Sequence, residues 1–203
     1  MSKNKISKNW INKQKRDLYV RKSKKEGYRS RAVYKIQEID EKYRILKNGI
    51  SLIDLGSAPG SWSQYAAKKI KNGKILSIDT QDVDKIKNTF QIKGDFTDIN
   101  NQKKIKNYFP NKVDVVLSDM AANTTGNKYL DSTSTGELCI SAIKFSKEIL
   151  NSKGIFVSKI FMGASFHDII NEAKKTFNEV RIYKPEASRK ESKENFIICK
   201  NLL

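Results

Sequence analysis

The stretch "SLIDLGSAPGSWSQYAAKKI" at residues 51–70 decides the fold. Its apolar run ends at Asp54, passes through Gly56 and Gly60, and then takes on the pattern of a helix. A strand, a glycine turn and a helix in this order are typical of open α/β sheets, where ligands bind beyond the carboxyl ends of the strands. The first question is therefore which ligand this turn holds.

The rest of the chain alternates between short β-branched runs and longer amphipathic segments. We expect strands over 50–56, 74–79, 91–96, 113–119, 154–161, 179–185 and 194–200, and helices over 28–43, 61–70, 97–109, 133–151 and 165–177. This alternation predicts one α/β domain, with a mostly parallel sheet and helices on both faces. The last two strands have only a short polar loop between them, so they form a hairpin and one of them runs antiparallel.

Positive charge is concentrated at the start of the chain. The 203 residues carry a net charge of +18, and residues 1–31 hold 12 Lys and Arg against Asp17 and Glu26. A lysine-rich composition from an AT-rich genome explains part of the excess but not this concentration. This concentration of positive charge favours nucleic acid or an anionic membrane surface as the binding partner. The interleaved Trp10, Tyr19 and Tyr28 favour nucleic acid, because aromatic rings stack on bases. We therefore expect a basic nucleic-acid-binding arm over residues 1–31 and one further domain over 32–203.

Other features limit the class of protein. Cys139 and Cys199 lie far apart in apolar surroundings, which disfavours a disulfide framework. No apolar run approaches the roughly 20 residues that span a bilayer, and no secretory signal is visible. We expect a soluble, intracellular monomer that does not bind membranes. The choice between cytoplasm and an organelle stays open, because residues 1–16 contain no acidic residue.

The glycine turn lacks the signatures of a phosphate site. Its spacing is neither the Gly-x-Gly-x-x-Gly of dinucleotide-binding proteins nor the Gly-Lys-Ser/Thr of a P-loop, and it contains no lysine. Instead Asp54, Asp79 and Asp95 end three successive predicted strands. Carboxylates at such positions accept hydrogen bonds from ribose hydroxyls. Three of them suit a nucleoside that carries positive charge, such as S-adenosylmethionine.

The only histidine, His167, suits a surface or capping position, and no cluster of metal-ligating residues is visible in the sequence. The remaining candidates for catalytic groups are lysines and carboxylates in apolar segments. Lys159 interrupts the apolar "IFVSKIF", and Asp119 ends "VVLSD" on the neighbouring predicted strand. A buried lysine is costly unless it is paired, and burial favours its neutral, basic form. Lys35 and Glu194 are further candidates. Each of the four alone also suits an ordinary role: a snorkelling strand end, a cap, a helix surface or a loop.

Several motifs in order carry a resemblance that covers the chain from about Trp10 to its end. "RSRAVYKIQEI", "DLGSAPGSWSQY", "GDF", "LSDMAANTTG", "VSKIF" and "SRKESKENFII" resemble the FtsJ/RrmJ family of S-adenosylmethionine-dependent RNA ribose 2′-O-methyltransferases. The resemblance implies a Rossmann-like class I methyltransferase fold, with a seven-stranded sheet in which one strand is antiparallel. It also implies ribosomal RNA or the ribosomal subunit as partner.

The resemblance assigns roles to particular residues. The family's catalytic tetrad matches Lys35, Asp119, Lys159 and Glu194, and its cofactor contacts match Gly60, Trp62, Asp79, Asp95 and Asp119. Two positions depart from the family pattern: Ser61 replaces a common glycine, and Ala122 replaces a proline after Asp119. The second change loosens the turn beside the substrate.

We expect methyl transfer to a ribose 2′-hydroxyl, at a uridine of large-subunit ribosomal RNA, with Lys159 as the base. A tRNA or mRNA-cap ribose methyltransferase of the same family is the alternative within the class. A non-catalytic RNA-binding module and a nicotinamide-dependent oxidoreductase are alternatives from other classes. The glycine spacing disfavours the oxidoreductase, and the lysine inside "VSKIF" disfavours the non-catalytic module.

Overall fold

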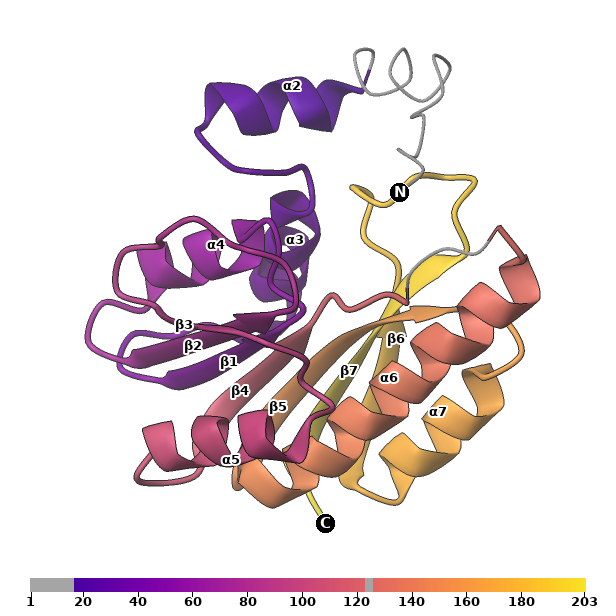
Figure 1. Cartoon of the computed structure of the whole chain (residues 1–203). Helices are drawn as coiled ribbons and strands as arrows, with labels where there is room; N and C mark the ends of the chain where they lie inside the picture. The colour runs from indigo at the N-terminus through magenta and orange to yellow at the C-terminus, as the bar shows by residue number, and fades with distance from the viewer. Residues whose placement is uncertain (1–16, 123–125) are drawn as a thin grey trace, which may run out of the picture.

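A computed structural model describes residues 17–122 and 126–203, and it contains one seven-stranded sheet (Figure 1). The strands are β1 (Ser51–Leu55), β2 (Lys74–Asp79), β3 (Phe90–Lys93), β4 (Val113–Ser118), β5 (Leu150–Phe161), β6 (Phe177–Tyr183) and β7 (Glu194–Leu202). The helices are α2 (Leu18–Lys25), α3 (Val33–Tyr43), α4 (Ser61–Lys69), α5 (Ile99–Tyr108), α6 (Lys128–Ile149) and α7 (Phe166–Lys174).

The sheet has the strand order β3-β2-β1-β4-β5-β7-β6. Pairs among β1 to β5 are parallel, whereas β7 runs antiparallel to both β5 and β6. The predicted mostly parallel sheet with a terminal hairpin is therefore confirmed. The order reverses between β1 and β4, since β2 follows on one side of β1 and β4 lies on the other. Ligands bind at such a switch point, beyond the carboxyl ends of the strands.

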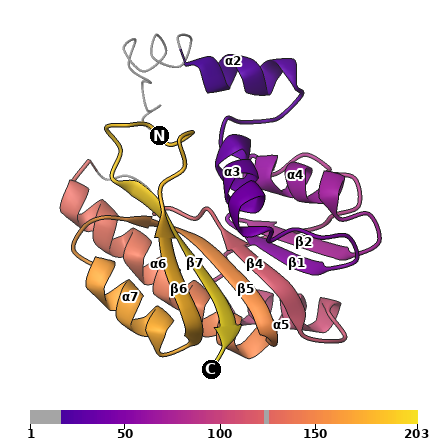
Figure 2. The ribbon, with the colours of Figure 1, turned by 180° about the vertical axis from the view of Figure 1, so that it is seen from behind.

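Two apolar layers hold the sheet between helices, as Figures 1 and 2 show from opposite sides. In β1, Ile53 and Leu55 pack with α5, α6 and α7, whereas Leu52 packs with α3 and α4 on the other face. This division follows from the alternation of side chains along a strand. Because both faces are covered, the strands read as nearly continuous apolar runs.

Several boundaries differ from those expected. The helix predicted over 28–43 begins at Val33, because Ser30 accepts a hydrogen bond from the N–H of Ala32 in a preceding turn. The strand predicted over 91–96 ends at Lys93, so Asp95 lies in a turn. The helix predicted over 133–151 begins at Lys128, where Asn127 caps the first turn. The following strand begins at 150 instead of 154.

The described part of the basic arm contains a helix that the sequence did not predict. Asp17 caps α2 through hydrogen bonds from the N–H groups of Tyr19 and Val20. Tyr19 and Tyr28 are half-buried and contact the ring of Tyr34 at centroid distances of 5.3 and 6.5 Å. These two rings pack against the protein, whereas Trp10, the third aromatic residue expected to stack on bases, lies outside the described residues.

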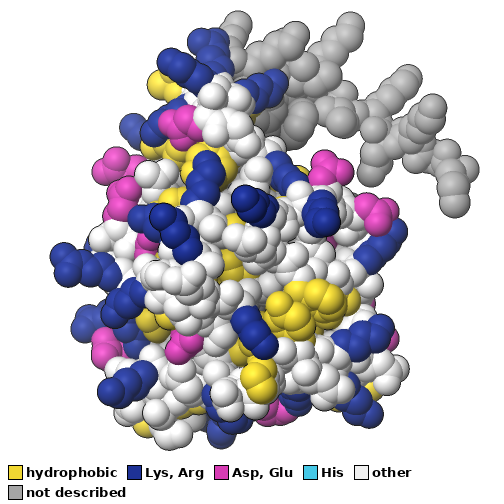
Figure 3. All heavy atoms as spheres, turned by 90° about the vertical axis from the view of Figure 1, so that its left-hand side faces the viewer, with side chains coloured by type: hydrophobic (Ala, Val, Ile, Leu, Met, Phe, Trp, Pro, Cys, Tyr) yellow, Lys and Arg dark blue, Asp and Glu magenta, His cyan; other side chains and the backbone are white. Residues whose placement is uncertain are grey.

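The described surface is basic in many places besides the arm. Figure 3 shows Lys and Arg side chains spread over the face that carries the early strands, with fewer acidic ones between them. Over residues 17–122 and 126–203, no helix is long and apolar enough to cross a membrane. Cys139 and Cys199 are buried free thiols, and His167 is exposed on α7, as the sequence predicted.

Candidate active site

The turn after β1 has a backbone that requires glycine. Gly56 and Gly60 have φ angles of +72° and +105°, which side-chain-bearing residues rarely adopt. A Cβ at Gly56 would lie 2.4 Å from Cγ of Met120, and the N–H groups of Gly56 and Ser57 donate to the carbonyl of Ile78. The turn is thereby held close to the carboxyl ends of β2 and β4.

Asp79 stands beside this turn at the end of β2. One oxygen of its carboxylate accepts from the N–H of Ala58 at 2.8 Å, and the other accepts from the N–H of Gln81 at 2.8 Å. A carboxylate has about four acceptor positions, so each oxygen keeps capacity for another donor. The half-buried Asp79 is therefore oriented by the backbone and able to accept hydrogen bonds from the two hydroxyls of a ribose.

Asp95 is the second carboxylate at this edge. Its Oδ1 accepts from the N–H and hydroxyl of Thr97, at 2.8 and 2.7 Å, and the side chain is exposed. A Cβ at Gly94 would lie 2.4 Å from Nδ2 of Asn101, which explains the glycine that precedes Asp95. The turn leaves Oδ2 of Asp95 available as an acceptor.

Asp54 does not line the turn as expected. Its side chain is fully buried, because α4 covers it and the Ser63 hydroxyl donates to its Oδ2 at 2.6 Å. Burial raises the pKa of Asp54 to about 7, and the nearby charges of Asp119 and Asp79 add to this increase, whereas the hydrogen bond from Ser63 opposes it. Its Oδ1 has no hydrogen-bond partner among the described residues. Asp54 therefore supports the turn from beneath and cannot contact a ribose.

The side chain of Trp62 is also turned away from the ligand position. It is 2 % exposed, donates from Nε1 to the carbonyl of Ala32 at 2.9 Å, and packs on Phe196. Only the backbone N–H of Trp62, in the first turn of α4, lies at the glycine turn, and first-turn N–H groups have no acceptor inside their helix. A ligand contact by Trp62 is therefore one made by its main chain.

Asp119 and Lys159 meet at the carboxyl ends of β4 and β5. Nζ of Lys159 lies 2.9 Å from Oδ1 of Asp119 and 2.6 Å from its carbonyl oxygen, and the lysine is 8 % exposed. Burial alone would raise the pKa of Asp119, but the ammonium groups of Lys159 and Lys35 and the Lys159 hydrogen bond hold it below the usual value. Asp119 is thus a carboxylate at neutral pH.

Lys35 and Glu194 form a second ion pair on the same edge. Nζ of Lys35 lies 2.7 Å from Oε1 and 2.8 Å from Oε2 of Glu194, and both side chains are largely buried. Glu194 is opposite Phe161 in the β5–β7 ladder, two residues beyond Lys159 on β5. The site therefore brings together two cations and two carboxylates, which come from α3, the end of β4, β5 and β7. Spacing along the sequence alone could not establish that these four residues meet.

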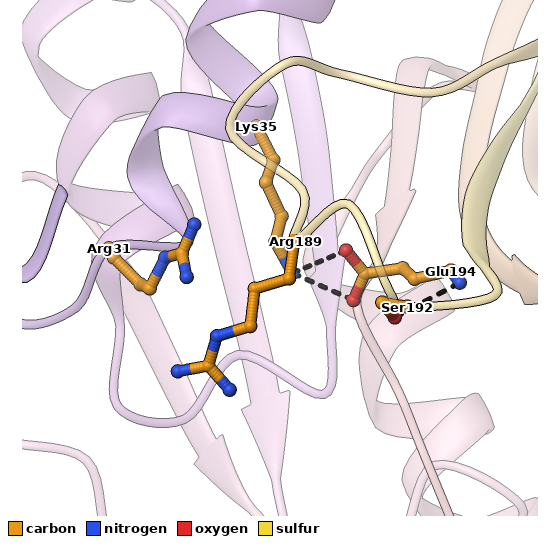
Figure 4. A pocket seen from close by; sticks show the side chains of 5 residues that line it. All are labelled: Arg31, Lys35, Arg189, Ser192 and Glu194. Carbon is orange, nitrogen blue, oxygen red and sulfur yellow. Dashed lines mark hydrogen bonds and ion pairs between the residues drawn. The ribbon is translucent and has the colours of Figure 1, made fainter. Parts of the chain in front are cut away.

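A basic cavity of about 240 Å³ adjoins this second pair (Figure 4). It is lined by Arg31, Lys35, Arg189, Ser192 and Glu194. Arg31 and Arg189 each contact the carboxylate of Asp17, so the start of α2 and the loop before β7 are joined across it. Three cations and one carboxylate in its wall make the cavity suitable for a phosphate or another anion.

Sequence reasoning missed the roles of three arginines, although Arg29 and Arg31 fall in the motif "RSRAVYKIQEI". Arg29 donates to the carbonyls of Pro59, Asp84 and Lys85 at 2.9 to 3.1 Å. It therefore ties the end of the basic arm to the glycine turn. Arg189 falls in the motif "SRKESKENFII", but its link to Arg31 depends on tertiary structure and could not be read from the sequence.

The described residues offer carboxylates, lysines and backbone N–H groups for chemistry. No group of three or more His, Cys, Asp or Glu residues suited to a metal ion occurs within 17–122 and 126–203. The site can bind a nucleoside at the β1–β2 side and hold a lysine amine beside it. Such an arrangement suits transfer of an already activated group to a hydroxyl.

Comparison with known proteins agrees with this geometry. The model of the family described as "FtsJ-like methyltransferase" matches residues 28–202. A Pelagibacter ubique protein named "Ribosomal RNA large subunit methyltransferase E" is 61% identical over 202 residues and all of both chains. A Rickettsia bellii protein of the same name is 40% identical, over 96% of this chain and 88% of its own length.

Solved structures show the same fold. A Plasmodium falciparum protein described as a ribosomal RNA methyltransferase has a TM-score of 0.78 and 34% identity, and the match covers 87% of this chain and 99% of that one. A Streptococcus mutans methyltransferase in complex with S-adenosylhomocysteine has a TM-score of 0.55 at 17% identity, covering 82% and 97% of the two chains. The family match covers residues 28–202, and the two named relatives align over at least 96% of this chain. This chain is a member of the FtsJ-like methyltransferase family.

Proposed function

We propose that this chain methylates a ribose 2′-hydroxyl of large-subunit ribosomal RNA, at a uridine, with S-adenosylmethionine as the methyl donor. The observation that carries the proposal is the buried Lys159, held against Asp119 next to the nucleoside side of the site. Relatives named for large-subunit ribosomal RNA support the substrate class. The choice of uridine rests on the family resemblance alone.

The residues around the glycine turn fit S-adenosylmethionine. Gly56 and Gly60 give the turn its positive-φ backbone, Asp79 offers oriented acceptors for the ribose hydroxyls, and Asp95 offers an exposed acceptor for the adenine amino group. Asp119 and the main chain of Trp62 complete the set. When bound, the cofactor supplies a methyl group on a sulfonium, which is already electrophilic.

We assign the remaining task, activation of the hydroxyl, to Lys159. A ribose hydroxyl is a weak acid, so removing its proton as the methyl group transfers accelerates the reaction by typically ~10²–10⁴. After the Lys159 ammonium has released a proton to solvent, its amine accepts the proton of the ribose hydroxyl, and Asp119 fixes its position. Lys35 adds positive charge beside Asp119, and Glu194 holds Lys35 in place through the ion pair.

Binding of the RNA is assigned to the basic groups next to the tetrad. The cavity of Arg31, Lys35 and Arg189 takes a backbone phosphate, and residues 1–31 act as an arm that contacts more of the RNA, with 32–203 as the catalytic domain. The enzyme acts as a monomer on the RNA or on the ribosomal subunit, inside the cell where ribosomes are assembled.

Mapping of 2′-O-methyl groups on total RNA tests the proposal. RNA is compared between cells with the gene, cells without it, and cells that express only a Lys159→Met variant. The proposal expects one uridine of large-subunit RNA to lose its methyl group in the last two. Loss of a mark in tRNA or at an mRNA cap instead would assign the enzyme to another substrate class. An unchanged map would favour a non-catalytic RNA-binding protein.

A further inference from the structure

A second cavity lies on the other side of the Asp119–Lys159 pair from the glycine turn. It encloses about 590 Å³ between the chain that follows β4, the first turns of α6, the end of β5 and the loop before β7. These segments come together at the edge where the parallel strands end (Figure 1). The proposed function uses none of the residues that line this cavity.

Its distance from the catalytic pair matches the size of one nucleoside. Ala121 and Phe161 line the cavity, and each is two residues beyond Asp119 or Lys159 along its own segment. Along β5, which ends at Phe161, two residues of extended strand correspond to roughly 7 Å between Cα atoms. A ribose whose 2′-oxygen lies at Lys159 has its base within this reach.

The walls suit a flat, uncharged ring. Tyr129 on α6 and Met162 after β5 both line the cavity, and they are 67% and 42% exposed, so both side chains are accessible to a ligand. Thr135 is 3% exposed, and its hydroxyl accepts from the N–H of Ala122 at 3.2 Å. This contact places the Thr135 hydroxyl in the wall of the cavity, beside the chain that follows β4.

The charges of the two cavities differ. Asp131, Glu191 and Lys193 line the larger cavity, so carboxylates outnumber ammonium groups there. The smaller cavity holds Arg31, Lys35 and Arg189 against one carboxylate. A phosphate is therefore favoured in the smaller cavity and disfavoured in the larger one.

We propose that the larger cavity binds the base of the acceptor nucleotide, turned out of its stack in the RNA. The base stacks on the ring of Tyr129, with the Met162 thioether also in contact and Thr135 donating a hydrogen bond to a ring acceptor. This inference rests on the proposed function, because it takes the 2′-hydroxyl to lie at Lys159. An extruded base also explains how a hydroxyl within folded RNA reaches a buried lysine.

Photocrosslinking tests the position of the base without requiring turnover. Large-subunit RNA labelled with 4-thiouridine, from cells without the gene, is irradiated with the enzyme, and crosslinked peptides are identified by mass spectrometry. The inference expects crosslinks within residues 129–135 or 161–164. Crosslinks found only in other segments would overturn it, whatever the map of methyl groups shows. That map alone decides the proposed function.

Kinetics of three variants add a second test. Stacking of a base on an aromatic ring predicts that Tyr129→Ala lowers kcat/KM on this RNA by about 5- to 100-fold, whereas Tyr129→Phe keeps the wild-type value. Leu130→Ala is the matched control, since Leu130 is the next residue, is 51% exposed and does not line the cavity. Equal values for Tyr129→Ala and Leu130→Ala would overturn the inference. Calorimetric binding of S-adenosylmethionine stays unchanged in all three.

Discussion

Nζ of Lys159 contacts both the carboxylate and the main-chain carbonyl of Asp119, at 2.9 and 2.6 Å. The lysine comes from the middle of the sheet, where a cation is costly unless it is paired. The pair therefore fixes the end of β4 against β5 and places an amine between the nucleoside turn and the second cavity. This single contact links the cofactor side of the site to its substrate side.

The pair predicts a non-additive effect on stability. Asp119→Ala leaves the Lys159 ammonium buried without its carboxylate, and we expect the free energy of unfolding to fall by about 3 kcal/mol. This value is at the low end for a buried pair, because a fifth of the Asp119 side chain is exposed. Adding Lys159→Met to this variant should recover at least half of the loss. Denaturant unfolding of the two single variants and the double variant measures this, and simple addition of the two losses would contradict the account.

Asp79 should control cofactor affinity. Charge-assisted hydrogen bonds contribute about 1.5–3 kcal/mol, so Asp79→Ala is expected to raise the Kd for S-adenosylmethionine by about 10- to 100-fold in calorimetry. Asp79→Asn, which keeps an acceptor for the N–H of Ala58, should lose less. Asp82→Ala is the control, because the Asp82 side chain is 84% exposed and pairs only with Lys93 among the described residues. A Kd for Asp79→Ala equal to that of the control would exclude Asp79 from the cofactor site.

Asp54 should make stability depend on pH. Burial raises its folded-state pKa to about 7 from an ordinary 3.8, so between these values the folded protein holds a proton that the unfolded chain releases. Stability from this group is therefore present at low pH and is lost as pH rises toward 7. The Asp54→Asn variant avoids the loss: it should be more stable than wild type at pH 8, by at most about 4 kcal/mol, and no more stable at pH 4.

Thermal unfolding of wild type and Asp54→Asn across this range is the measurement. Asn also accepts the hydrogen bond from Ser63, so the local packing is kept. An equal gap between the two proteins at pH 4 and pH 8 would mean that folding does not raise the pKa of Asp54.

Arg189 should contribute to RNA affinity through charge. Removing one phosphate contact lowers the slope of log affinity against log salt by about 0.7–0.9, so Arg189→Ala should weaken RNA binding most at low salt. Arg181→Ala serves as the control, because Arg181 is exposed on β6 and does not line the basic cavity. Filter binding over a salt series gives both slopes, and identical slopes for the two variants would move the phosphate site elsewhere.

The fold was predictable from the sequence because its signals are local. Apolar runs such as the one that forms β1 reflect the pattern of side chains along a strand, and the turn at Gly56 reflects backbone geometry. Both signals lie within a few residues of sequence. The start of α6 was missed, since the segment after Lys128 is rich in Ser and Thr and has little apolar periodicity. The end of β3 was missed because the contact of Gly94 with Asn101 is made only in the folded protein.

The site was predictable only in part, because several of its features depend on contacts between distant parts of the chain. Asp79 ends its strand as expected, and the Asp119–Lys159 contact follows from two adjacent strands. The burial of Asp54 was not predictable, because it depends on which face of β1 meets α4. The basic cavity depends on Arg189 approaching Arg31 from the far end of the chain, and no local pattern encodes that.

Single-turnover methylation of large-subunit RNA by Lys159→Met tests the central claim most directly. If Lys159 is the base, the rate falls by ~10²–10⁴ while the calorimetric Kd for S-adenosylmethionine stays within about twofold of wild type. Lys153→Met, an exposed lysine on the same strand, should keep the full rate. A Lys159→Met enzyme that binds the cofactor and transfers the methyl group at the wild-type rate would contradict the account.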